Sequence, residues 1–146
     1  MTAIRKLLLV DDDPRDVELI CHALRSCNLA NEIDVANDGL DALDYLRRKG
    51  KFLTRVGSQP ALVLLDVKMP KMSGLEVLRE IRLDPSLNKI PVVMLTSSRE
   101  QSDKIEGYHH GANAYVVKPI EFSEFVNAAQ RIGVFWLLVN EPPNEN

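Results

Sequence analysis

The run LLLVDDDP at residues 7–14 joins four apolar residues to three consecutive aspartates and a proline. A short, wholly apolar run bounded by turn residues is typical of a β-strand that is covered on both faces. Asp13 followed by Pro14 is typical of a helix start, because aspartate caps a first turn and proline fits the first helical position. The stretch therefore predicts a buried strand, an acidic turn and then a helix.

The same order of strand and helix recurs along the rest of the chain. Strands are predicted at residues 7–10, 32–36, 61–65, 91–95 and 114–117. Amphipathic stretches between and after them predict helices, and the stretch at 102–110 carries the fewest apolar positions. This alternation favours right-handed βαβ units. We therefore expect an α/β fold in which a doubly wound, five-stranded parallel sheet carries helices on both faces.

Composition narrows the class of protein. A chain of 146 residues with 45% hydrophobic and 27% charged residues fits one globular domain. Its longest apolar runs are far shorter than the roughly 20 residues that span a bilayer, and the first residues do not resemble a signal peptide, so we expect a cytoplasmic protein that does not enter a membrane. The net charge of −3 argues against a nucleic-acid partner, which normally requires a basic face.

Polar side chains follow four of the five predicted strands. Asp11 and Asp12 come directly after the first strand, Asp66 after the third, Thr96 after the fourth and Lys118 after the fifth. In an open parallel sheet, functional sites lie beyond the carboxyl ends of the strands, where the strand order reverses. The sequence therefore predicts that carboxylates, a hydroxyl and an ammonium group meet at one edge of the sheet.

Carboxylates held this close repel one another. Each pair at about 4 Å costs on the order of 4 kcal/mol at an effective dielectric constant near 20, so we expect a neutralising cation, and Mg²⁺ suits oxygen ligands of this kind. A carboxylate can also attack phosphorus and form an acyl phosphate, while a metal ion, a hydroxyl and a lysine stabilise the phosphoryl oxygens. The cluster therefore favours a phosphoryl acceptor.

Four motifs in this order resemble the receiver domain of two-component response regulators. They are LLVDD (8–12), LDVKMP (65–70) with Ser73-Gly74, LTS (95–97), and Gly111-Ala112 through YVVKP (115–119). The resemblance covers about residues 5–132. It implies a flavodoxin-like sheet with strand order 2-1-3-4-5, flanked by five helices.

The resemblance also implies a metal site and its ligands. It assigns Mg²⁺ to Asp12, Asp66 and the backbone carbonyl of Lys68, with Asp11 assisting, often through water. Asp13 extends the usual pair of acids to three, and we expect it to cap the helix rather than bind metal.

The resemblance assigns the phosphoryl chemistry as well. Asp66 would be the phosphorylation site, Thr96 and Lys118 would hold the phosphoryl group, and the peptide bond before Pro119 would be cis. Tyr115 would be a switch that swings inward as Thr96 moves. The donor would be a phosphohistidine of a sensor histidine kinase. Such a domain is not an enzyme in the ordinary sense, because it catalyses only its own phosphorylation and dephosphorylation.

Two features narrow the resemblance to stand-alone regulators that partner cyanobacterial phytochrome kinases. A long connection at residues 46–60 carries five basic residues, which form either a solvated face or a contact with the kinase. A receiver domain over residues 1–133 is followed at 134–146 by an apolar extension and a polar tail, without an effector domain. The expected partner is therefore a phytochrome-type histidine kinase.

The apolar extension has two interpretations. Residues 134–139 are six consecutive apolar residues that include Phe135 and Trp136, too many to leave in water. They either fold back on their own domain or, with the last helix, form a symmetric homodimer.

Three other functions compete with the receiver interpretation. A hydrolase of the haloacid-dehalogenase type also uses an aspartate nucleophile, but its second acid lies two residues on, where this chain has Lys68. A flavin- or nucleotide-binding domain would need a Gly- or Ser/Thr-rich loop after the first strand, where this chain has three aspartates. A phosphorylation-independent interaction module of the same fold remains the alternative.

Overall fold

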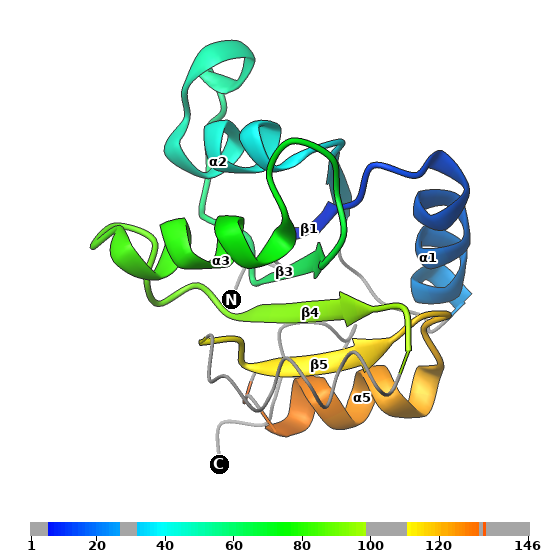
Figure 1. Cartoon of the computed structure of the whole chain (residues 1–146). Coiled ribbons are helices and arrows are strands. Elements are labelled where there is room, and N and C mark those ends of the chain that lie inside the picture. The colour runs from blue at the N-terminus through cyan, green and yellow to red at the C-terminus, as the bar shows by residue number, and fades with distance from the viewer. Residues whose placement is uncertain (1–5, 27–31, 99–110, 132, 134–146) are drawn as a thin grey trace.

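The computed structural model describes residues 6–26, 32–98, 111–131 and 133, and its five strands form one parallel sheet. The strands are β1 (Leu7–Val10), β2 (Ile33–Ala36), β3 (Leu62–Asp66), β4 (Val92–Thr96) and β5 (Ala114–Val117). Their order in the sheet is β2-β1-β3-β4-β5, and every neighbouring pair is parallel (Figure 1). This order confirms the doubly wound, flavodoxin-like sheet, in which β1 and β3 lie next to each other.

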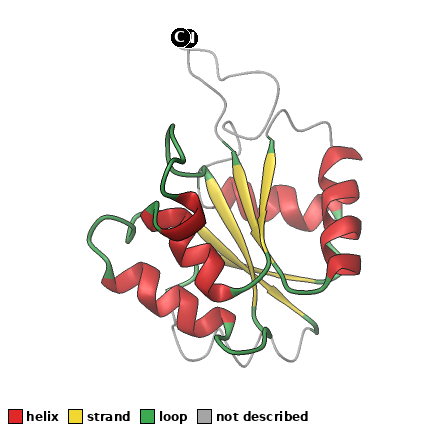
Figure 2. Cartoon of the chain, turned by 90° about the horizontal axis from the view of Figure 1, so that it is seen from above, coloured by secondary structure: helices red, strands yellow, loops and turns green. Residues whose placement is uncertain are grey.

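Helices cover both faces of the sheet (Figure 2). The described helices are α1 (Pro14–Ser26), α2 (Gly39–Arg47), a short 3₁₀ helix η1 (Gly50–Phe52), α3 (Gly74–Leu83) and α5 (Phe122–Arg131). The helix expected near residues 102–110 and the extension at 134–139 lie outside the described residues. None of the helices in the described part of the chain is long and apolar enough to cross a membrane.

The strands divide the core into two layers because successive side chains point to opposite faces of a sheet. Leu7 and Leu9 of β1 pack with buried residues of α1 and α5, whereas Leu8 and Val10 pack with those of α2 and α3. β1, β3 and β4 are buried along their whole length, as their apolar sequences predicted. Each fully buried aliphatic side chain contributes roughly 1.5–3 kcal/mol, so this core fixes where the strands end.

Helix caps place the helices directly beyond the strands. The Asp38 side chain accepts a hydrogen bond from the backbone N–H of Asp41 at 2.8 Å and begins α2. Ser73 accepts from the N–H of Glu76 at 3.2 Å and begins α3. Asp13 accepts from the N–H of Arg15 at 2.9 Å, which agrees with its expected capping role before α1.

The basic connection between α2 and β3 is braced by its own arginines. Arg48 donates to the carbonyl oxygens of Arg55 and Gly57 at 3.0 and 2.7 Å. Arg55 donates through Nε to the carbonyl of Tyr45 at 2.9 Å and stacks 4.1 Å from the centre of the Tyr45 ring. We call residues 48–59 the arginine-braced loop. Two of its guanidinium groups therefore hold the loop together, so these arginines do more than face solvent, and a contact with the kinase stays a prediction.

Candidate functional site

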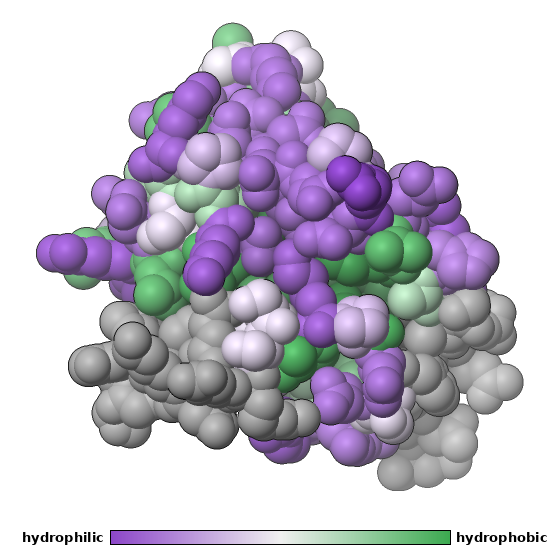
Figure 3. All heavy atoms as spheres, turned by 45° about the vertical axis from the view of Figure 1, so that its right-hand side comes forward, coloured by the Kyte–Doolittle hydropathy of each residue, from purple (hydrophilic) through white to green (hydrophobic). Residues whose placement is uncertain are grey.

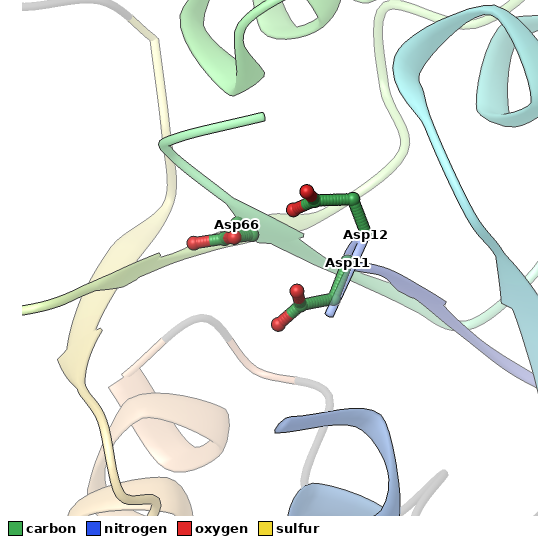
Figure 4. Close-up of side chains that lie close together, drawn as sticks. All are labelled: Asp11, Asp12 and Asp66. Carbon is green, nitrogen blue, oxygen red and sulfur yellow. The ribbon is translucent and has the colours of Figure 1, made fainter. Parts of the chain in front are cut away.

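Three aspartates meet at the carboxyl ends of β1 and β3. Asp11, Asp12 and Asp66 each offer a carboxylate oxygen, and these oxygens all lie within 4.8 Å of one another (Figure 4). Asp11 and Asp66 are buried, whereas Asp12 is exposed. They come together because β1 and β3 are neighbours in the sheet, although the sequence separates them by about 55 residues. We call these three residues the acid cluster.

Lys118 reaches the acid cluster from the end of β5. Its Nζ lies 3.2 Å from Oδ1 of Asp66 and 3.3 Å from Oδ2 of Asp11. A third carboxylate, that of Asp16 in the first turn of α1, is the nearest of the three at 2.8 Å. The peptide bond between Lys118 and Pro119 is cis, as expected. One ammonium group is therefore shared by three carboxylates from two strand ends and a helix.

Burial and crowding shift the protonation equilibria of this site. Burial raises the pKa of Asp66 from 3.8 to about 6, and the charge of Asp11 adds to the increase, while Lys118 opposes it. Burial acts to lower the pKa of Lys118, but the hydrogen bond to Asp16 and the charges of Asp66 and Asp11 outweigh it and raise that pKa. Lys118 therefore stays protonated, and the ionised form of Asp66 is less favoured than that of an ordinary carboxyl group.

Thr96 ends β4 beside the acid cluster. It is fully buried, and its Oγ1 donates to the carbonyl oxygen of Ser98 at 3.3 Å. Its strand pairs with β3 through Asp66 and Leu95, and its own carbonyl accepts from the N–H of Lys118 at 2.8 Å. The hydroxyl of Thr96, the carboxylate of Asp66 and the ammonium group of Lys118 thus come from three adjacent strands, as the sequence predicted.

The loop after β3 folds closely back onto the backbone of Asp66. The N–H of Gly74 donates to the carbonyl of Val67 at 2.8 Å. A Cβ atom at position 74 would lie 2.0 Å from the backbone oxygen of Asp66, so only glycine fits there. Lys68 lies inside this loop, exposed and two residues beyond Asp66. Its assignment as a carbonyl ligand stays a prediction.

Tyr115, the expected switch residue, lies in β5. It pairs in register with Met94, is half-buried and packs against the core layer under α2 and α3. Val117, two residues later, pairs with Thr96. Tyr115 and Thr96 therefore lie on adjacent strands, and the inward swing of Tyr115 stays a prediction.

Sequence reasoning missed Asp16. An acid in the first turn of a helix is common because it complements the helix dipole, so the sequence carried no signal of a link to Lys118.

The structure also places Asp16 in the lining of a groove. Its described lining residues are Asp16, Leu19, Ile20, Ala23, Ser97, Lys118, Pro119 and Ile120. Figure 3 views the face toward which the strands point, where hydrophilic side chains surround smaller hydrophobic areas.

The residues of the acid cluster fit a hard divalent cation. They offer oxygen donors from three carboxylates, two of them buried, at spacings that one ion can bridge. Burial first, and the charge of Asp11 second, raise the pKa of Asp66 against the opposing effect of Lys118. The arrangement can therefore hold a cation beside a nucleophilic carboxylate, a hydroxyl and a lysine.

Comparison with known proteins agrees with this geometry. Residues 7–130 match the family model of the response regulator receiver domain. The chain is 36% identical to the response regulator Rcp1 of Synechocystis sp. over 131 residues, which cover 90% of this chain and 88% of Rcp1. The chain also resembles the solved structure of the Mn²⁺-bound form of Rcp1. That match has a TM-score of 0.70 and 34% identity, and it covers 96% of this chain and 99% of that one.

Two further solved structures are similar. The bacteriophytochrome response regulator AtBRR has a TM-score of 0.90 and 54% identity, and the match covers 96% of this chain and all of that one. The phosphorylated cyanobacterial phytochrome response regulator RcpA has a TM-score of 0.72 and 38% identity over 92% of this chain and 95% of that one. The chain therefore belongs to the response regulator receiver domain family and is related to the phytochrome response regulators.

Proposed function

We propose that this chain accepts a phosphoryl group on Asp66 from the phosphohistidine of a sensor histidine kinase and then presents a changed surface to a partner. One observation carries the proposal. Asp66 is a buried carboxylate that lies 3.2 Å from Lys118 and within one ion's reach of Asp11 and Asp12. A structural aspartate would gain nothing from this crowding, whereas a phosphoryl acceptor needs it.

The reaction uses groups that the site holds. A carboxylate oxygen of Asp66 attacks phosphorus, the bond from phosphorus to the imidazole nitrogen breaks, and that nitrogen keeps the electron pair and takes up a proton. The product is an acyl phosphate. Lys118 and the hydroxyl of Thr96 stabilise phosphoryl oxygens. The protein thus catalyses only its own phosphorylation and dephosphorylation.

Asp12, Asp66 and the carbonyl of Lys68 would hold Mg²⁺, with Asp11 assisting. When bound, the ion would supply positive charge that offsets the negative charge of the site during phosphoryl transfer. Support comes from the donor set of the acid cluster and from the Mn²⁺-bound form of the related Rcp1. Tyr115 would then follow Thr96 inward and alter the surface near β5 and α5.

We propose that the kinase docks in the groove beside Lys118. Leu19, one of its lining residues, is 62% exposed, and another, Lys118, contacts Asp66 at 3.2 Å. A helix that carries the phosphohistidine could pack its apolar side chains there while the imidazole faces Asp66. The relation to AtBRR, Rcp1 and RcpA favours a phytochrome-type kinase.

Homodimerisation is a separate part of this proposal. The last helix and the extension that contains Phe135 and Trp136 would form the symmetric contact. The extension lies outside the described residues, so its sequence alone supports this step. Sedimentation of wild type and of the Phe135→Ala/Trp136→Ala variant tests it. A wild-type chain that is monomeric at micromolar concentration contradicts it.

Incubation with Mg²⁺ and acetyl phosphate, followed by intact-mass measurement, tests phosphoryl acceptance. Wild type should gain one phosphoryl group, and Asp66→Asn should gain none. Asp13→Asn, which removes an exposed acid nearby, serves as the control and should react like wild type. A folded, Mg²⁺-bound wild type without an adduct would favour the phosphorylation-independent interaction module instead.

A further inference from the structure

We propose that Asp16 is a positioning residue that draws Lys118 toward α1 and so increases the affinity of the acid cluster for a divalent cation. The inference rests on the proposed function, because it concerns the metal site that phosphoryl acceptance requires. It adds a role for a side chain outside the acid cluster.

Distances single out the Asp16 carboxylate among the partners of Lys118. Nζ of Lys118 lies 2.8 Å from Asp16, against 3.2 Å from Asp66 and 3.3 Å from Asp11. The last two are members of the acid cluster, whereas Asp16 is not. The nearest carboxylate partner of Lys118 therefore belongs to α1 and stands outside the acid cluster.

Lys118 and a bound cation compete for the same two carboxylates, those of Asp66 and Asp11. Each is positive, and each gains by lying close to Asp66 and Asp11. Two positive charges also repel at these distances, by an amount that varies inversely with their separation. Any contact that draws Lys118 away from Asp66 therefore frees carboxylate charge for the cation and weakens the repulsion.

Asp16 is fixed firmly enough to exert this effect. It lies in the first turn of α1, and the same helix is anchored in the core by Ile20 and Leu24, which are 3% and 1% exposed. The Asp16 side chain itself is 36% exposed, so solvent weakens the pair without removing it. A purely local role, in which Asp16 only complements the helix dipole, would leave Lys118 unaffected.

Mg²⁺ affinity of the purified chain, measured by calorimetry, tests the proposal. Asp16→Asn should weaken binding by about fivefold, because the amide keeps the side-chain shape but loses the charge that holds Lys118. Asp13→Asn makes the same charge change at an exposed position beside the cluster and should weaken binding by less than about twofold. Asp16→Glu, which restores the charge, should recover most of the affinity.

A double-mutant cycle separates an action through Lys118 from a direct effect of charge. In a Lys118→Met background, Asp16→Asn should cost no more affinity than Asp13→Asn does. In the metal-free protein, the side-chain ¹⁵N resonance of Lys118 should shift in Asp16→Asn and stay in place in Asp13→Asn. An undiminished loss in the Lys118→Met background, or an unchanged resonance, would overturn the proposal.

The outcomes also separate this inference from the proposed function. If wild type and Asp16→Asn bind Mg²⁺ with equal affinity, the role of Asp16 is overturned and the proposed phosphoryl acceptance is not affected. If the Mg²⁺ affinities are as expected but acetyl phosphate does not phosphorylate the wild-type chain, the role of Asp16 is supported and phosphoryl acceptance is overturned. A wild-type chain that binds no Mg²⁺ would overturn both.

Discussion

The acid cluster and the arginine-braced loop both gather charged groups, but their partners differ in kind. At the acid cluster, carboxylates face other carboxylates, and Lys118 is shared between two of them and Asp16 of α1. In the loop, the guanidinium of Arg55 meets acceptors of matching geometry. These are the carbonyls of Tyr45 and Ser58 at 2.9 and 3.4 Å and the side-chain oxygen of Gln59 at 2.7 Å.

The difference separates a region whose charged groups are satisfied within the protein from one whose charges still repel one another. These three contacts of Arg55 end on neutral oxygens of the same loop or of α2, so Arg55 needs no ligand to satisfy the donors that make them. The acid cluster holds like charges whose repulsion a cation would relieve. The fold therefore stabilises the loop and leaves the cost of the acid cluster to be offset by binding.

The first test, with the largest expected effect, compares a glycine that packs against Asp66 with a glycine of the arginine-braced loop. Gly74→Ala should lower the free energy of unfolding by at least about 3 kcal/mol, because the new Cβ would lie 2.0 Å from the backbone oxygen of Asp66. Gly57→Ala, at φ +95° with nothing within 4 Å of the new Cβ, should cost only about 1 kcal/mol of backbone strain. Urea denaturation measures both, and equal losses would contradict the close packing of the loop after β3 against Asp66.

A second test removes charge from the acid cluster and keeps its shape. Asp66→Asn should raise the free energy of unfolding of the chelator-treated protein by about 1–3 kcal/mol at pH 7. The reason is the pKa of Asp66, which is about 6 in the folded protein and 3.8 ordinarily. Saturating Mg²⁺ should cancel the advantage, because only wild type gains the full binding energy.

The sign of the pH dependence follows from the same pKa. Between about pH 4 and 6 the folded chain holds a proton on Asp66 that the unfolded chain has released. The contribution of Asp66 to stability therefore falls as pH rises through this window, and the advantage of Asp66→Asn grows from small at pH 4 to its full value at pH 7. Denaturation at several pH values with a chelator present measures it. An advantage that is constant with pH would show that burial of an ionised Asp66 is not its cause.

The sequence predicted the fold well because buried parallel strands must be apolar along their whole length. Leu7–Val10 and Ala114–Val117 were placed with their observed ends, and the other three strands to within one residue. The site was predictable for the same reason, since the first polar residue after such a strand marks the carboxyl edge of the sheet. Asp66 and Thr96 follow this rule although the structure counts each as the last residue of its strand.

What the sequence could not show depends on contacts between distant or ordinary residues. Asp16 and Lys118 are separated by 102 positions, and an acid in a first helical turn needs no partner to explain it. The arginines of the braced loop bond to backbone carbonyls, which carry no sequence signature. The helix expected near residues 102–110 and the dimer contact at Phe135 and Trp136 lie outside the described residues and stay predictions.

The third and smallest effect is expected where charge is kept and shape is lost. Arg55→Lys preserves the positive charge of the arginine-braced loop, but an ammonium group cannot reproduce the planar fork that reaches Tyr45 and Gln59 while stacking on the Tyr45 ring. We expect a loss of about 1–2 kcal/mol in the free energy of unfolding. Lys49→Met, at an exposed neighbouring position, should change it by less than about 0.5 kcal/mol.

The contrast between the two regions is completed by thermal and urea denaturation of Arg55→Lys and Asp66→Asn, together with Mg²⁺ titration of both variants. Arg55→Lys should destabilise the chain and leave its Mg²⁺ affinity unchanged, because the loop completes its hydrogen bonds without help from the acid cluster. Asp66→Asn should do the reverse, stabilising the metal-free chain and weakening Mg²⁺ binding. If Arg55→Lys were as stable as wild type, the charge of the loop rather than its hydrogen-bond geometry would be the property that matters. Its basic residues would then be better explained as a contact for the kinase.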